Sequence, residues 1–252
     1  MAETIASIKK HLEETTFEKR PNIMKLYEAD ERQGVQKLLE KYKKEQERFR
    51  FELERTERMK EFEYKYKEYA YICGIDEVGR GPLAGPVVAG AVILPKDENI
   101  LYLNDSKQLS EKKREELYDV IMEKAVAVGI GVVPSATIDD VNILQATYEA
   151  MRIAIGKLSV KPDILLNDAV NIPGVDIKQV GIVKGDARSV SIAAASIIAK
   201  VTRDRMMEEY DKIYPEYKFA SNKGYGSKDH IAALKEIGPC AIHRSTFIHN
   251  FV

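Results

Sequence analysis

The sequence is poor in cysteine, has no tryptophan and carries almost no net charge. Its two cysteines, Cys73 and Cys240, lie far apart and belong to no CxxC or Cys/His cluster. This excludes a zinc-finger or redox motif and leads us to expect two buried thiols in a reducing compartment. The 39 Lys and Arg residues are balanced by 40 Asp and Glu residues, giving a net charge of -1. A chain that attracts nucleic acid or anionic lipid as a whole is therefore excluded, and any site for a polyanion must be local.

The sequence also lacks long hydrophobic runs. No stretch approaches 18 apolar residues, and the opening residues MAETIASIKK contain no apolar core of a signal peptide. We therefore expect a soluble, cytoplasmic protein with no membrane partner, and we expect it to be a monomer. At 252 residues and 44% hydrophobic, the chain is long enough for a substantial core and for one or two domains.

The density of charge divides the chain near residue 70. Residues 1–70 carry 17 basic and 16 acidic side chains, whereas residues 71–252 carry 22 and 24. The sequence thus predicts an N-terminal helical extension over 1–70 and a main domain over 71–252. Apolar residues at helical spacing predict two helices in the extension. Asp30, three residues before Gln33, is typical of the N-cap of the longer helix.

Two interpretations of the extension remain open. It is either a solvated helical clamp on the main domain or a surface that contacts nucleic acid. The second is favoured by a local basic run with two aromatic residues inside it: Lys41, Tyr42, Lys43, Lys44, Arg48, Phe49 and Arg50.

After residue 69, short runs rich in Val, Ile and aromatic residues alternate with helical segments. The strand-like runs are YAYICGID, PVVAGAVIL, VAVGIGVV, DILLND and QVGIVKG, and the helical segments lie at 110–125, 141–158 and from Ser189 to about Tyr210. This alternation predicts an α/β fold in which helices cover a sheet. The carboxyl ends of strands in such sheets are where sites form.

Four acidic residues lie at predicted strand ends. Asp76 and Glu77 end the first strand, Asp168 ends the fourth and Asp186 follows the fifth. Neighbours in a regular strand point to opposite faces, so Asp76 and Glu77 are expected to share a site only if the backbone leaves the pleat directly after Asp76. Each acid alone is more typical of a turn or a helix cap, but four carboxylates without His or Cys predict a Mg²⁺ or Mn²⁺ site.

A pair of such ions activates water and stabilises the leaving oxygen in phosphodiester hydrolysis, which makes a nuclease the leading interpretation. The run Gly79-Arg80-Gly81 is not part of a P-loop or a GxGxxG fingerprint. It either forms a simple tight turn or brings bare backbone close to a sugar or phosphate, with a guanidinium beside it.

The stretch from Gly74 to Pro86, GIDEVGRGPLAGP, is long enough to be specific. It resembles the signature of the ribonuclease HII family, also called type 2 ribonucleases H, and the resemblance covers 71 to about 247. Further matches are DSKQLS at 105–110, ILLND at 164–168, KGD at 184–186, AAASIIAKVTRD at 193–204 and KGY at 223–225. Asn167-Asp168-Ala169 departs from the Val/Ile-Asp-Gly usual in the family, although the acid is present. Residues 1–70 match no part of the minimal family domain.

The resemblance implies a ribonuclease H-like mixed sheet flanked by helices, with a C-terminal helical region. It implies endonucleolytic cleavage of the RNA strand in RNA/DNA hybrids and incision at single ribonucleotides in duplex DNA, leaving 3′-hydroxyl and 5′-phosphate ends. Mg²⁺ or Mn²⁺, two ions with substrate bound, would be held by Asp76, Glu77, Asp168 and Asp186.

On the substrate side, the resemblance implies that the Gly79-Arg80-Gly81 backbone and Tyr225 recognise the ribose 2′-hydroxyl, the group that distinguishes RNA from DNA. Tyr225 lies in a basic, glycine-rich loop, SNKGYGSK, where a core-capping role is the alternative. Lys107, Lys184 and Lys223 are candidate phosphate contacts, or else solvated surface lysines. The four histidines show no ligand spacing and receive no role.

Two other classes of function remain open. Another two-metal DNA enzyme of the same fold, such as a recombinase or exonuclease, would share the acids but gives no reason for Gly79-Arg80-Gly81 and Tyr225. A catalytically inactive hybrid-binding module is expected to have lost at least one acid, and all four are present.

Overall fold

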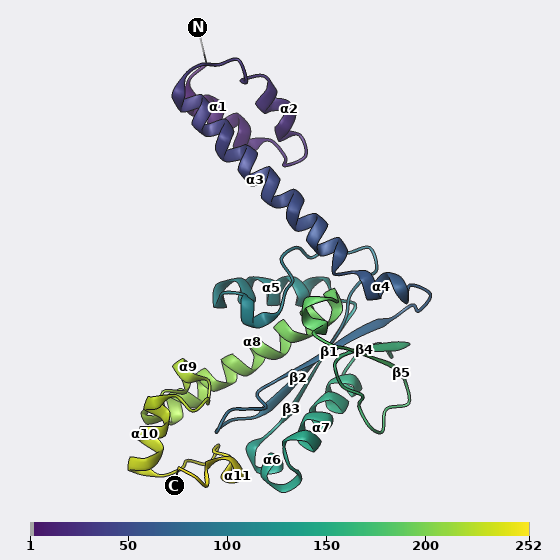
Figure 1. Ribbon diagram of the computed structural model, residues 1–252, viewed down its shortest axis with the longest axis vertical. Coiled ribbons are helices and arrows are strands. Elements are labelled where there is room, and N and C mark those ends of the chain that lie inside the picture. Colours follow the sequence, from purple (N-terminus) through teal and green to yellow (C-terminus); the bar gives the residue numbers. More distant parts are fainter. Residues whose placement is uncertain (1–2, 252) are drawn as a thin grey trace. The chain divides into compact units, whose positions relative to one another are not determined.

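The structure is a computed structural model that describes residues 3–251. The chain divides into two compact units, Met1–Arg55 and Thr56–Val252. Figure 1 labels their elements along the chain. None of the helices within the described residues is both long and apolar enough to span a membrane.

The first unit is a small helical bundle. It contains α1 (Ile5–Glu14), α2 (Arg20–Lys25) and most of α3 (Gln33–Arg58), and α4 (Glu61–Lys65) follows in the second unit. Its core consists of apolar residues at helical spacing, which are Ile8, Leu12, Met24, Val35, Leu39 and Tyr42.

Two predictions for this segment are wrong. Residues 3–70 form four helices and not two, because α2 and α4 have only six and five residues and are too short to show a helical period. Asp30 is not the N-cap residue of α3, because the helix begins at Gln33. Its carboxylate instead accepts hydrogen bonds from the backbone and guanidinium of Arg32, at 3.1 and 2.9 Å.

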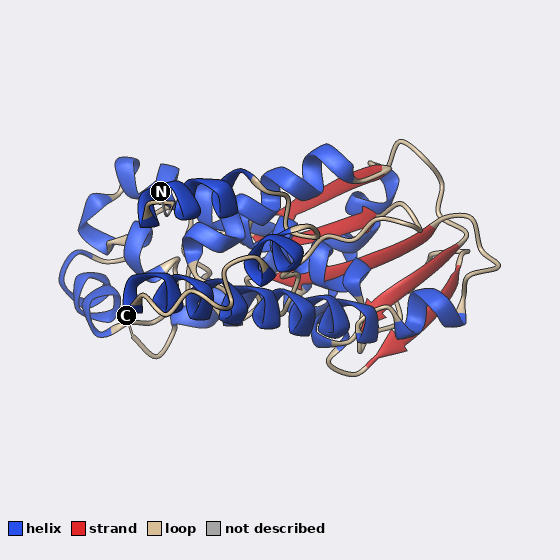
Figure 2. Ribbon diagram, turned by 90° about the horizontal axis from the view of Figure 1, so that it is seen from above, coloured by secondary structure: helices blue, strands red, loops and turns tan. Residues whose placement is uncertain are grey.

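The second unit is built on a five-stranded mixed sheet in the order β3-β2-β1-β4-β5. The strands are β1 (Ile72–Val78), β2 (Val87–Ile93), β3 (Ala127–Val133), β4 (Ile164–Asp168) and β5 (Lys178–Ile182). β1, β2 and β3 pair antiparallel, whereas β4 lies parallel to both β1 and β5. The five predicted strands are confirmed. Figure 2 shows the strands side by side with helices packed against them.

Two long helices carry most of the packing on the sheet. α8 (Val190–Ile213) packs on β1 and β2, and α7 (Ile143–Gly156) packs on β2 and β3. The contact with α8 is close because Gly74 has no side chain. A Cβ there would lie 2.0 Å from the backbone carbon of Ser191. This close approach places the buried face of α8 directly against the strand that carries Asp76.

The remaining elements complete the two layers and a C-terminal cluster. α5 (Glu111–Lys124) packs on α8, and α6 (Ser135–Val141) precedes α7. Short 3₁₀ turns form at Ser106–Gln108, Gly185–Ala187 and Pro215–Tyr217. α9 (Phe219–Asn222), α10 (Lys228–Ile237) and α11 (Ser245–Ile248) form the predicted C-terminal helical region, around a core that includes Phe219 and Leu234.

Candidate active site

Asp76 and Glu77 lie inside β1 and not at its end. Their backbones pair with Gly90 and Ala89 of β2, and pairing continues to Val78. The pleat therefore continues past Asp76, so the condition set for the two carboxylates to share a site is not met. The two carboxylates are still close enough to interact, since the charge of Glu77 helps to raise the pKa of Asp76 after the larger effect of burial.

Asp168 is the last residue of β4. Parallel pairing of β4 with β1 brings its carboxylate to the same edge of the sheet as Asp76. The following residue, Ala169, has φ +54°, so the chain turns sharply away. One Asp168 oxygen, Oδ1, accepts a hydrogen bond from the backbone N–H of Gly185 at 2.8 Å. That bond ties the end of β4 to the turn that carries Asp186.

Asp186 sits in the 3₁₀ turn after β5. Burial raises its pKa, and the negative charges of Asp105 and Asp168 raise it further. The four predicted acids thus come together at one edge of the sheet. Asp105 is a fifth acid near them that the sequence analysis missed, although it is the first residue of the DSKQLS motif.

Burial and mutual repulsion make this cluster a site for positive charge. Burial, with the charges of Glu77 and Asp168, raises the pKa of Asp76 to about 8. Burial is also the main reason for the raised pKa of Glu77, whose Oε2 is buried without a hydrogen-bond partner. An orphaned carboxylate oxygen among three more carboxylates fits a hard divalent cation in charge and in donor chemistry.

The acidic side chains are not yet arranged as the ligands of a bound ion. Among residues 3–251, no group of three or more Asp, Glu, His or Cys side chains has the arrangement of a finished metal site. Two of the acids have partners within the protein: Glu77 Oε1 faces the guanidinium of Arg80 at 3.3 Å, and Asp168 accepts from the Gly185 amide.

Two buried serines support Asp76, and the sequence analysis missed both. Ser196 of α8 hydrogen-bonds to the Asp76 carboxylate and lies 2.9 Å, Oγ to Oγ, from Ser106. Since Ser196 donates to Asp76, Ser106 must donate to Ser196. The signals available in the sequence were the motifs that contain them, DSKQLS for Ser106 and AAASIIAKVTRD for Ser196.

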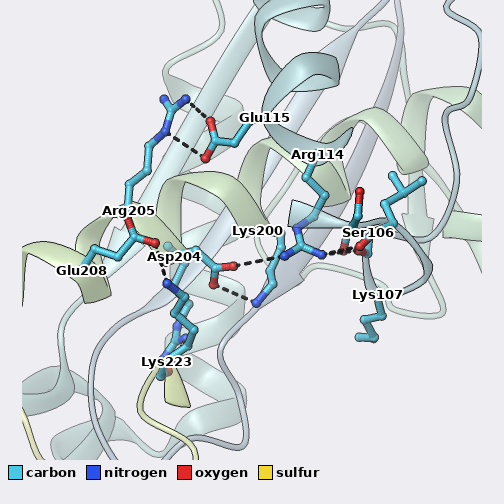
Figure 3. A network of polar contacts seen from close by, with 12 residues as sticks. Ser106, Lys107, Arg114, Glu115, Lys200, Asp204, Arg205, Glu208 and Lys223 are labelled. Carbon is cyan, nitrogen blue, oxygen red and sulfur yellow. Dashed lines mark hydrogen bonds and ion pairs between the residues drawn. The ribbon is translucent and has the colours of Figure 1, made fainter. Parts of the chain in front are cut away.

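A charged network holds the segment around Ser106 against α8 (Figure 3). Arg114 donates to the backbone oxygens of Ser106 and Leu109 at 3.1 and 2.6 Å. Asp204 pairs with Lys200 at 2.7 Å and lies 3.8 Å from Arg114. Lys107 extends away from this network, and its charge opposes part of the rise that burial causes in the pKa values of Glu77 and Asp186. Lys107 is therefore exposed beside the acids.

The Gly79-Arg80-Gly81 segment and Tyr225 are neighbours, although they are distant in the sequence. Gly79 has φ +90°, and a Cβ there would lie 2.3 Å from Nε of Arg203, so only glycine fits without strain. A Cβ at Gly81 would lie 4.0 Å from the Tyr225 ring. The ring is 45% exposed and available to a ligand. The structure therefore brings together the residues that the sequence suggested for recognising a sugar.

The other two candidate lysines differ from Lys107. Lys184 is exposed and adopts φ +55° at the start of the Asp186 turn. Lys223 is largely buried, and its ammonium group lies 2.5 Å from Glu208 Oε1 (Figure 3). Any phosphate contact by Lys223 would therefore compete with this ion pair.

Two buried histidines lie behind Tyr225, where the sequence analysis gave histidine no role. Nδ1 of His230 is 2.8 Å from the Tyr225 carbonyl, so this nitrogen must donate. Nε2 of His230 then accepts from Nε2 of His243 at 2.9 Å. Nδ1 of His243 in turn accepts from the Cys240 backbone N–H at 3.0 Å. Each ring needs a single proton, so this network fits two neutral imidazoles.

The prediction of two buried thiols is confirmed for Cys73 but not for Cys240. Cys73 is a fully buried free thiol, and burial raises its pKa to about 12. Cys240 is also free but only half-buried, and its sulfur lies 3.2 Å from Nδ1 of His243.

This histidine pair predicts a loss of stability in mild acid. Burial and the neighbouring His230 lower the pKa of His243 to about 4, from an ordinary value of 6.5. The unfolded chain therefore binds more protons than the folded chain below pH 6.5. The free energy of unfolding should fall as pH drops from about 6.5 towards 4, by an amount on the order of 2–3 kcal/mol.

Urea unfolding of the wild type and of His243→Gln at pH 7.5, 6.0 and 5.0 checks this expectation. His243→Gln should be less stable at pH 7.5 and lose less stability on acidification. Parallel pH curves for the two proteins would rule out His243 as the titrating group.

Known proteins resemble this chain over most of its length. The family model described as "Ribonuclease HII" matches residues 73–250. The chain belongs to the ribonuclease HII family. A second model, "Ribonuclease HII N-terminal domain", matches residues 4–67, so the N-terminal segment also has a counterpart that the sequence analysis did not identify. The predicted ribonuclease H enzyme class, a metal-dependent endoribonuclease, is confirmed at this level.

Individual relatives match over nearly their full lengths. A ribonuclease HII of Lachnoclostridium phytofermentans is 66% identical over 89% of this chain and 88% of its own. One of Acetivibrio thermocellus is 51% identical over 99% of this chain and 98% of its own. Among solved structures, ribonuclease H2 of Pyrococcus horikoshii OT3 covers 70% of this chain and 93% of its own, with 28% identity and a TM-score of 0.59. The predicted ribonuclease H-like fold is thus confirmed.

Proposed function

We propose that this protein hydrolyses the RNA strand of RNA/DNA hybrids and also incises duplex DNA at single embedded ribonucleotides, leaving 3′-hydroxyl and 5′-phosphate ends. The observation that carries the proposal is the position of four carboxylates at one edge of the sheet, where Asp168 interacts with each of the other three, in a unit that also pairs the Gly79–Gly81 backbone with an exposed tyrosine. In this proposal the acids hold the metal ions for cleavage, and the Gly79–Gly81 backbone with the Tyr225 ring selects RNA over DNA.

In this proposal Asp76, Glu77, Asp168 and Asp186 hold two Mg²⁺ or Mn²⁺ ions when substrate is bound. Such ions activate water and stabilise the leaving oxygen. Asp76 is fixed by Ser196, and Asp168 by the Gly185 amide, so both enter the site from rigid backbone. Glu77 has an unpartnered buried oxygen, which a cation would satisfy.

On the substrate side we propose that the Gly79-Arg80-Gly81 backbone contacts the ribose 2′-hydroxyl, with the Tyr225 ring packed beside that sugar. The 45% exposed ring and its closeness to Gly81 support this role. Arg80 and the lysines Lys107 and Lys184 are exposed and available to neighbouring phosphates. We assign Lys223 a weaker phosphate contact because it is paired with Glu208.

A cleavage assay on three duplexes tests the proposal. The substrates are a DNA duplex with one ribonucleotide, an RNA/DNA hybrid and an all-DNA duplex, each with Mg²⁺, Mn²⁺ or EDTA. We expect cutting of the first two with either metal, no cutting in EDTA and none of all-DNA. Cutting of the all-DNA duplex would favour a general two-metal DNA enzyme, and binding without any cutting would favour an inactive hybrid-binding module.

We also propose that the N-terminal helical unit adds affinity for nucleic acid without adding chemistry. Of its basic run, Lys43, Arg48 and Arg50 are exposed on α3, whereas Lys44 pairs with Glu40 at 2.8 Å. Changing those three exposed residues to Gln should raise KM several-fold and reduce the salt dependence of binding, because fewer counterions are released.

The measurement is KM and hybrid affinity at several salt concentrations, together with single-turnover cleavage at saturation, which should stay the same. The matched control is the triple change of Lys112, Lys124 and Lys235 to Gln, on α5 and α10. Equal salt slopes for the wild type and the α3 variant would leave this unit with a structural role only.

A further inference from the structure

The Gly79-Arg80-Gly81 segment is held from behind by one buried side chain. The guanidinium of Arg244 donates to the carbonyl oxygen of Gly79 at 2.6 Å and to that of Arg80 at 2.9 Å. It also donates to the carbonyl oxygen of Gly85 at 3.0 and 2.8 Å. Arg244 is fully buried, so it touches the loop from inside the protein.

These bonds fix the direction of two backbone N–H groups. In a trans peptide the C=O of one residue and the N–H of the next point in opposite directions, and this chain has no cis peptide among its described residues. Since the carbonyls of Gly79 and Arg80 point inward to Arg244, the N–H groups of Arg80 and Gly81 point away from it. Within residues 3–251, neither N–H has a hydrogen-bond acceptor in the protein.

Arg244 also places a positive charge behind these amides. Among the described residues it forms no ion pair with a carboxylate, and its four bonds are all to carbonyl oxygens. Burial and the adjacent charge of Arg203 lower its pKa to about 9, which still leaves it charged at neutral pH. A buried charge that polarises the peptides makes their outward N–H groups better donors to an oxygen.

The position of Arg244 is fixed by its own neighbours. Asp139 of α6 accepts hydrogen bonds from the backbone N–H groups of Ser245 and Thr246, at 2.8 and 3.0 Å, directly after Arg244. A second buried arginine, Arg203, donates to the carbonyl oxygens of Pro86 and Lys223 at 2.9 and 2.8 Å. Arg203 therefore ties the same loop to the segment that carries Tyr225.

We propose that Arg244 is a positioning residue for RNA selectivity: by drawing the Gly79 and Arg80 carbonyls inward, it presents the Arg80 and Gly81 amides as a paired donor to the ribose 2′-oxygen. This inference rests on the proposed function, because it supplies the reason for the loop's conformation in that site. Arg244 touches no substrate, so its loss should remove the preference for a ribonucleotide and leave the rest of the binding surface in place.

The test compares the affinities of the full-length protein for two duplexes, identical except for one ribonucleotide, in Ca²⁺ under conditions where no cleavage occurs. For the wild type we expect tighter binding of the ribonucleotide duplex. Arg244→Gln should reduce this preference at least tenfold, with all-DNA affinity within about twofold of wild type. Arg244→Lys keeps the charge but cannot reach three carbonyls at once, so its preference should be intermediate. Arg152→Gln is the control, since this half-buried arginine donates to the Pro173 carbonyl, outside the loop.

A second measurement separates positioning from general loss of structure. Adding guanidinium at millimolar concentration to Arg244→Ala should restore a large part of the ribonucleotide preference, and should not change that of the wild type. A variant that keeps the full preference overturns the inference, as does one that loses affinity for both duplexes equally and is not rescued. Absence of any preference in the wild type would instead overturn the proposed function.

Discussion

Replacing Asp76 or Asp168 with Asn should reduce cleavage of a ribonucleotide-containing duplex by about a thousandfold or more, while hybrid binding survives. The change keeps the shape of the side chain and removes the charge that a divalent cation requires. Loss of metal-assisted stabilisation is worth several kcal/mol, and about 4 kcal/mol corresponds to a factor of about a thousand in rate. Single-turnover rates at saturating Mg²⁺ measure the effect.

The stability of the metal-free protein provides an independent check. The pKa of Asp76 is raised to about 8, so the folded protein binds a proton that the unfolded chain releases above its ordinary pKa of 3.8. In the metal-free protein, burial of Asp76 therefore lowers the free energy of unfolding progressively as pH rises from about 3.8 to about 8. Asp76→Asn avoids this penalty and should melt no lower than wild type at pH 7 without metal.

Asp119→Asn is the matched control, because this residue is exposed on α5 and lies outside the acid cluster. It should cleave at the wild-type rate. A tenth or more of the wild-type rate in Asp76→Asn or Asp168→Asn would mean a loss of less than about 1.4 kcal/mol and would refute the ligand assignment.

Tyr225→Ala should lower kcat/KM on the single-ribonucleotide duplex far more than Tyr225→Phe. The ring lies beside Gly81 and is 45% exposed, so a sugar bound at the loop would pack against it. Stacking of this kind is worth roughly 1–3 kcal/mol, or a factor of about 5 to 150 in kcat/KM. The phenylalanine keeps this contact. Neither variant should cut all-DNA, because the backbone donors at Gly79–Gly81 remain.

Measured kcat/KM values for both variants decide between ring and hydroxyl. Equal losses would transfer the role to the hydroxyl, and no loss in either would make Tyr225 a structural residue. Tyr64→Ala is the control: it also removes an exposed tyrosine, on α4, whose hydroxyl bonds to Glu57 at 2.6 Å.

The sequence by itself determined the strands, the long helices of the second unit and the family. Short Val- and Ile-rich runs bounded by Gly or Pro are a local property, so the pattern of residues alone was enough to locate β1 to β5. The four acids in or directly after strands were predictable as a group because parallel strands bring their carboxyl ends to one edge. The stretch from Gly74 to Pro86 was specific enough to indicate the ribonuclease HII family.

The short helices α2 and α4 could not be predicted from the sequence alone. The six-residue α2 is stabilised by packing of Met24 in the first unit's core and not by its own period. The extension of β1 past Asp76 likewise depends on the pairing of Glu77 and Val78 with Ala89 and Val88 of β2, which no local pattern in β1 reveals.

Only the tertiary structure decided which residues support the site. Arg244 reaches Gly79 across 165 positions, Ser196 meets Ser106 across 90, and His230 pairs with His243 beneath Tyr225. Ser106 and Ser196 lie in the motifs DSKQLS and AAASIIAKVTRD, but no local pattern in the sequence pairs any of these residues with its partner. Their roles come from burial, because a buried arginine, serine or histidine must find hydrogen-bond partners wherever the fold places them. Here those partners are the backbone and side chains that form the candidate active site.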